Sequence, residues 1–66
     1  MLVFINGEQK DFSSEINLTE LIQQLDITSK GLAIAINNAV VPKNDWEQTK
    51  LTEQDKITLI KATQGG

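Results

Sequence analysis

The residues best suited to chemistry are the last two, Gly65 and Gly66, which end the 66-residue sequence. A segment without Cβ atoms can enter a narrow channel and lie extended against another backbone. The stretch Thr63, Gln64, Gly65, Gly66 would span up to about 13–14 Å when fully extended, enough to carry a carboxylate into another protein's active site. As an acyl-adenylate, the Gly66 carboxylate would have a good leaving group and accept a nucleophile. The alternative interpretation is that the two glycines have no function and are the end of a clipped or fraying chain.

The other side chains offer little for catalysis. The sequence has no cysteine and no histidine, which excludes thiolate chemistry and the usual zinc sites, and leaves the serines without a base. Two close carboxylate pairs, Asp45/Glu47 and Glu53/Asp55, are typical of solvated loops. Trp46 is interpreted as packing over the edge of the core. We expect no catalytic residue, no metal and no cofactor.

Charge and hydropathy narrow the class of protein. Six basic residues stand against nine acidic ones, for a net charge of −3, and no basic cluster is present to bind nucleic acid. No apolar run approaches the length of a membrane span, and the first residues do not resemble a signal peptide. We expect a cytoplasmic protein with one domain, residues 1–61, and a flexible Gly-Gly tail, residues 62–66.

The first half of the sequence predicts a hairpin and a helix. Residues 1–5 are continuously apolar, Asn6-Gly7 is a strong hairpin signal, and the mostly polar residues 8–12 are typical of an edge strand. Asn17 and Glu20 have the spacing of a capping box. Leucines and isoleucine recur at helical spacing over residues 18–26, where we expect a helix.

The second half predicts three more strands. Residues 32–36 alternate large and small, so Leu32, Ile34 and Ile36 should face the helix and Ala33 and Ala35 should face outward. After an Asn37-Asn38 turn, residues 39–41 form an edge strand ending at Pro42, and residues 43–50 are irregular. Residues 56–61 form the last strand, adjacent and parallel to the first at the centre of the sheet. The fold class is α+β, with a mixed five-stranded sheet and one helix on one face.

The face of the sheet away from the helix is a candidate docking surface. If alternate residues of the first and last strands fill the core, Leu2, Phe4, Ile60 and Ala62 face outward, with contributions from Ala33 and Ala35. An exposed apolar patch on a small domain indicates a partner site. A covering loop, or an inverted first strand, would remove the patch.

The chain resembles the ubiquitin-like sulfur carriers of the ThiS/MoaD family, which have a β-grasp fold. The resemblance covers the whole sequence, and is most specific in residues 35–43, AINNAVVPK, followed by Trp46. It is similar to the AIN…VVPR…W stretch of the members that serve thiamine biosynthesis. Lys43 stands where the family often has arginine, and lysine would not reproduce a bidentate contact.

The resemblance implies a mechanism and partners. A ThiF-type adenylating enzyme would use ATP to adenylate Gly66, and sulfur from a cysteine desulfurase or another donor would replace AMP to give a thiocarboxylate. The thiazole synthase ThiG would then take the sulfur. The alternatives are a MoaD-like subunit of molybdopterin synthase, a ubiquitin-like protein modifier, and an interaction module with an idle tail.

Overall fold

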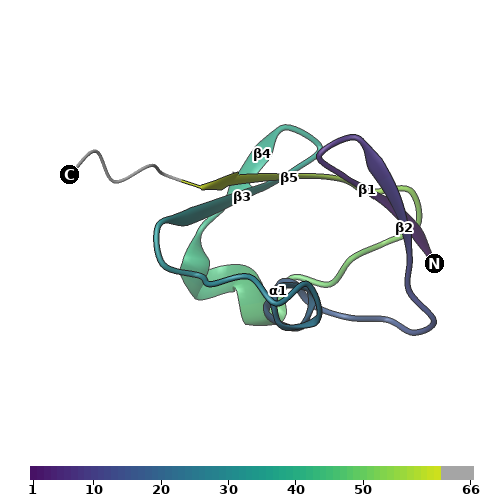
Figure 1. Ribbon diagram of the computed structural model, residues 1–66, viewed down its shortest axis with the longest axis horizontal. Coiled ribbons are helices and arrows are strands. Elements are labelled where there is room, and N and C mark those ends of the chain that lie inside the picture. The colour runs from purple at the N-terminus through teal and green to yellow at the C-terminus, as the bar shows by residue number, and fades with distance from the viewer. Residues whose placement is uncertain (62–66) are drawn as a thin grey trace.

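A computed structural model describes residues 1–61 of the chain (Figure 1). The predicted tail, residues 62–66, lies outside the described residues. The elements, in chain order, are β1 (Leu2–Ile5), β2 (Glu8–Asp11), α1 (Leu18–Gln24), β3 (Leu32–Ile36), β4 (Ala39–Val41), the 3₁₀ helix η1 (Lys43–Gln48) and β5 (Lys56–Lys61). The strands form one five-stranded sheet in the order β2-β1-β5-β3-β4. Figure 1 shows α1 and η1 on the same side of this sheet, which confirms the predicted two-layer α+β architecture.

The first hairpin forms where the sequence predicts it. Asn6 and Gly7 both have positive φ, 51° and 82°, the combination that a two-residue hairpin turn requires. The turn pairs Ile5 with Glu8, and all four residues of β2 are exposed at the edge of the sheet. The prediction of a polar edge strand is therefore confirmed.

Helix α1 begins with the predicted capping box. The Glu20 backbone N–H donates to Asn17 Oδ1 at 2.7 Å, and the Asn17 N–H donates to Glu20 Oε1 at 3.0 Å. The helix ends at Gln24, two residues short of the predicted 18–26 span. Asp26 has a φ of 57°, and a residue in the left-handed region cannot continue a right-handed helix. The predicted C-terminal boundary was wrong for this reason.

The centre of the sheet matches the prediction. β1 and β5 are adjacent and parallel, with Phe4 opposite Lys56 and Ile5 opposite Ile57. β3 runs antiparallel along β5 from Leu32↔Lys61 to Ile36↔Ile57. Alternate residues of these strands point to the helix and form a core with α1, and the most deeply buried side chains are Val3, Leu18, Leu21, Ile34, Leu51 and Ile57.

Ala35 faces outward, as predicted, but little of its surface is exposed. Its register places it on the outward face, between Val40 on β4 and Thr58 on β5. Only 8% of its surface is exposed, because a single methyl group between two longer side chains is shielded by them. Ala33 is exposed as predicted.

Two predictions for the second half of the chain are wrong. Residues 43–48, predicted to be irregular, form η1; a short i→i+3 helix leaves no apolar periodicity to detect. Asp55 is not a solvated loop residue, because it is 8% exposed. Its Oδ2 accepts the Thr52 N–H at 2.8 Å and its Oδ1 accepts from Asn37 Nδ2 at 3.2 Å, so it joins two turns that lie far apart in the sequence.

Trp46 is buried on the helix side of the sheet. It is 4% exposed, and its indole Nε1–H donates to the Val41 carbonyl at 2.9 Å. The predicted packing role of this side chain is confirmed. Through it, η1 is fastened to the end of β4.

Candidate functional site

The outer face of the sheet, away from α1, presents apolar side chains. Because successive side chains alternate between faces, the burial of Val3, Ile5 and Ile57 sends their neighbours outward. The residues of this outer face on the four apolar strands are Leu2, Phe4, Ala33, Ala35, Val40, Lys56, Thr58 and Ile60. Val40 is 72% exposed and Ile60 is 55% exposed.

The described members of the predicted docking surface all lie on this face, but not together. Leu2 and Phe4 are half-buried on β1, and Phe4 lies level with Lys56 of β5. Ile60 is four residues further along β5. At about 3.3 Å per residue, it lies about 13 Å along the sheet from Phe4 and about 20 Å from the level of Leu2. The docking surface itself stays a prediction.

The most exposed large apolar side chains of the outer face are Ile60 and Val40. Ile60 pairs with Ala33, and in the next row Thr58, Ala35 and Val40 lie side by side across three strands. Sequence reasoning missed Val40. The signal was available, because a two-residue Asn37-Asn38 turn pairs Ile36 with Ala39 and so sends Val40 outward.

The chain approaches its C-terminus along β5. This strand lies at the centre of the sheet order and ends at Lys61, opposite Leu32. The predicted site residues that follow it, Ala62, Thr63, Gln64, Gly65 and Gly66, lie outside the described residues. The structure therefore places their attachment point at the end of β5, where this strand pairs with β3.

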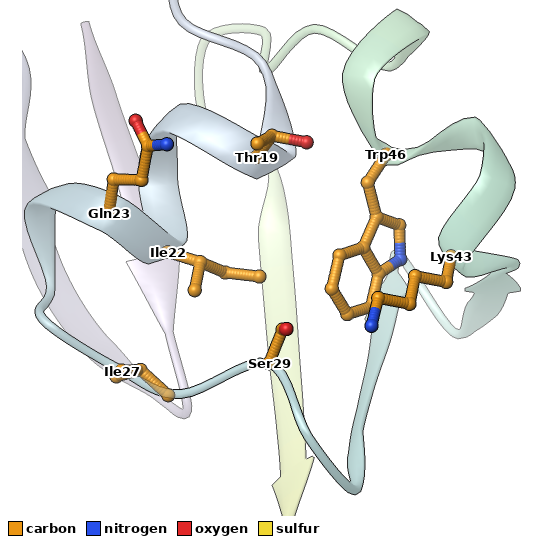
Figure 2. A pocket seen from close by; sticks show the side chains of 7 residues that line it. All are labelled: Thr19, Ile22, Gln23, Ile27, Ser29, Lys43 and Trp46. Carbon is orange, nitrogen blue, oxygen red and sulfur yellow. The ribbon is translucent and has the colours of Figure 1, made fainter.

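A shallow hollow of about 270 Å³ lies between the two helices on the other side of the sheet. In Figure 2, Lys43 and Trp46 of η1 face Thr19 and Ile22 of α1 across it. The described ion pairs do not include Lys43. The hollow thus has an apolar floor and one cation at its rim, without an acid–base pair for catalysis.

A second hollow, of about 320 Å³, lies on the outer face between the Asn6-Gly7 and Asn37-Asn38 turns, beside Phe4 and Lys56. Within residues 1–61, His, Cys, Asp and Glu form no group of three that could hold a metal ion. In that same part of the chain, no helix has the length and apolar character to cross a membrane.

Solved structures with the same fold cover the whole chain. The crystal structure of the thiamine biosynthesis protein ThiS from Geobacter metallireducens superposes with a TM-score of 0.88 over all of both chains, at 20% identity. The solution structure of a thiamine biosynthesis protein from the same organism superposes with a TM-score of 0.81, over 88% of its chain. The fold is thus the ubiquitin-like β-grasp, as predicted.

Sequence comparisons give the family. The model of the ThiS family matches residues 3–66, so the chain belongs to the ThiS family. It is 32% identical to the sulfur carrier protein ThiS of Escherichia coli over the full length of both chains. It is also 33% identical to the uncharacterized protein ycf40 of Trieres chinensis, over 96% of this chain and 86% of that one.

A third relative is much longer. The thiazole synthase of Paramagnetospirillum magneticum is 30% identical over all of this chain, which spans 20% of that protein. Family membership makes the chain a small sulfur carrier protein, and not a catalyst.

Proposed function

We propose that the chain carries sulfur as a thiocarboxylate on Gly66. A Gly66 carboxylate oxygen attacks the α-phosphorus of ATP in a ThiF-type adenylating enzyme. The new C–O–P linkage forms as the α–β phosphoanhydride breaks and pyrophosphate leaves. The outcome is an acyl-adenylate whose leaving group is AMP.

Sulfur enters in the second step. A hydrosulfide or persulfide sulfur forms a bond to the Gly66 acyl carbon and AMP departs. When the donor is the persulfide of a cysteine desulfurase, this bond leaves the carrier joined to the desulfurase cysteine through an S–S bond. A thiol then attacks the cysteine sulfur and forms a disulfide with it, and the Gly66 thiocarboxylate is released. The thiocarboxylate sulfur then passes to the thiazole synthase ThiG. No side chain of this protein takes part in bond making.

The observation that carries this proposal is the family match, which runs through residues 3–66 and so includes Gly65 and Gly66. The relative in which this sequence matches part of a thiazole synthase supports the second partner, because a carrier and its acceptor gain from being held together. The lack of cysteine is compatible, since the sulfur is held at the chain end.

Intact-mass spectrometry tests the proposal. The protein is incubated with ATP, the adenylating enzyme and a sulfur donor, and its mass should rise by the difference between sulfur and oxygen. A variant lacking Gly65 and Gly66 should show no gain. A variant with one residue added after Gly66 is the matched control for length, and it should also stay unmodified.

This experiment and two further assays separate the alternatives. Release of AMP without a gain in mass would contradict the thiocarboxylate. Covalent attachment to lysines in a lysate, lost on deletion of Gly66, would indicate a protein modifier. Stable assembly with a molybdopterin-synthase large subunit, in place of sulfur transfer to ThiG, would overturn the assignment to thiazole formation.

A further inference from the structure

Among residues 1–61, one side of β5 is without a neighbouring strand just before β5 ends at Lys61. β1 pairs with β5 at only two positions, Phe4↔Lys56 and Ile5↔Ile57, and then turns away at Asn6-Gly7. β5 runs on for four more residues, to Lys61. On the β1 side, therefore, the second half of β5 has no neighbouring strand among residues 1–61.

The register shows which backbone groups point to this edge. The Asn37 N–H donates to the Lys56 carbonyl at 2.8 Å, so residues 37 and 56 form a hydrogen-bonded pair of the antiparallel ladder with β3. Such pairs alternate with pairs that do not bond. The main-chain groups of Thr58 and Ile60 consequently face β3, and those of Leu59 and Lys61 face the open edge.

The hydrogen bonds at the start of the edge agree with this assignment. The Asn6 N–H donates to the Ile57 carbonyl at 2.9 Å, and Asn6 Oδ1 accepts the Leu59 N–H at 2.8 Å. The Asn6 side chain thus supplies to the Leu59 N–H the acceptor that the main chain of a neighbouring strand would otherwise supply. For the groups that follow, the Leu59 carbonyl and the Lys61 N–H and carbonyl, the hydrogen bonds described for residues 1–61 give no partner.

We propose that Leu59–Lys61 is a strand-addition site, where an extended segment of the adenylating enzyme pairs with β5 and continues the line of β1. This inference rests on the proposed function and names how the partner holds the chain. An exposed row of N–H and C=O groups is a template for main-chain pairing. A strand bound here would fix the direction of β5 immediately before the residues that carry Gly66.

Two features favour an enzyme segment over a second copy of this chain. The edge is only three residues long and carries the exposed Lys61 side chain, and short, lysine-bearing edges disfavour pairing between copies. The edge also leads without interruption into residue 62. A partner that must position the chain end gains more from this site than a second copy does.

Amide hydrogen exchange of the full chain, alone and bound to its adenylating enzyme, tests the site. The Lys61 N–H should exchange quickly in the unbound protein and at least about tenfold more slowly in the complex. The Ile60 N–H bonds within the β3–β5 ladder, so it is the internal control and should be protected in both states. Equal Lys61 exchange in the two states would overturn the inference.

Substitution of Lys61 gives the second measurement. Lys61→Pro removes the N–H that faces the edge and leaves the ladder with β3 intact. It should weaken binding to the enzyme by about 2- to 13-fold, the value of one net backbone hydrogen bond. Lys61→Ala, the matched control, keeps the N–H and should bind more tightly than Lys61→Pro by the same factor. An ester in place of the 60–61 amide removes the N–H without a proline ring, should Lys61→Pro fail to fold.

The outcomes separate this inference from the proposed function. Normal adenylation with equal affinities for Lys61→Pro and Lys61→Ala would overturn strand addition and leave the carrier function standing. Failure of the wild-type chain to be adenylated would overturn both. If the Lys61 N–H were protected without enzyme, and more strongly at higher protein concentration, the edge would be assigned to a second copy of the chain. The proposal that the enzyme binds there would then be overturned.

Discussion

Replacement of Ile60 by threonine should weaken docking to the adenylating enzyme without unfolding the protein. Threonine keeps the β-branch that suits a strand but removes the apolar end of the side chain. Ile60 is 55% exposed on the outer face, next to Ala33 and in the row adjacent to Val40. Changes at exposed positions usually alter the free energy of unfolding by less than about 0.5 kcal/mol.

The expected loss of affinity follows from this exposure. Complete burial of an isoleucine side chain contributes about 1.5–3 kcal/mol. The 55% that remains exposed would therefore contribute about 0.8–1.7 kcal/mol when a partner covers it. That free energy corresponds to a Kd for Ile60→Thr raised by about 4- to 18-fold.

Titration calorimetry with the adenylating enzyme would measure this change, and circular dichroism would give the Tm. Ile34→Val is the matched control, because Ile34 is fully buried on the opposite face. It should cost about 0.5–1.5 kcal/mol of stability and leave the Kd unchanged. If Ile60→Thr bound as tightly as wild type, the outer face near Ile60 would not be the docking surface.

Three further changes test the packing, and the fluorescence of the single tryptophan, Trp46, reports unfolding in urea for each. Leu21→Ala should remove about 2–5 kcal/mol from a domain whose total is about 3–10 kcal/mol, because Leu21 is fully buried; a smaller loss would mean that the core around α1 is loose. Asn17→Ala should cost about 1 kcal/mol through loss of the capping box, and an unchanged urea midpoint would contradict that bond. Asp55→Ala should cost about 1–3 kcal/mol by leaving the Thr52 N–H unpaired, whereas Glu53→Ala, at an exposed neighbour, should cost less.

The parts of the fold that the sequence predicted are those set by local chemistry. Asn6-Gly7 requires positive φ at two successive residues, and few other pairs accept it. Asn17 and Glu20 satisfy each other's backbone within one turn. The alternation in β3 and β5 assigned the inner face correctly, because a half-buried strand repeats every two residues.

The errors came from contacts between distant residues. Asp55 has the composition of a surface turn, and only the arrival of Asn37, eighteen positions away, makes it a buried junction. The left-handed conformation of Asp26 ended α1 at Gln24, two residues before the end that the apolar pattern predicted. Val40 could have been placed from the register of its hairpin, but its exposure depends on β4 being the sheet edge.

The candidate site was predictable to different degrees for a related reason. Gly66 was identified from the residue types at the end of the sequence, and that identification requires no knowledge of the fold. The open edge at Leu59–Lys61 depends on the difference in length between β1 and β5 and on where Asn6 turns the chain, so it could not be found before the sheet was known.

The pairing of β5 explains how so small a domain can serve as a carrier. β3 pairs with β5 along five positions, whereas β1 pairs with it at two. The long ladder with β3 fixes the strand that leads to the chain end against the core around Ile34 and Ile57. The short ladder leaves main-chain groups available on the other side. A longer β1 would strengthen the sheet and, by the same hydrogen bonds, occupy the edge that we assign to the enzyme. On this argument, the early turn at Asn6-Gly7 is a functional feature, and extension of the first hairpin should stabilise the domain while slowing its adenylation.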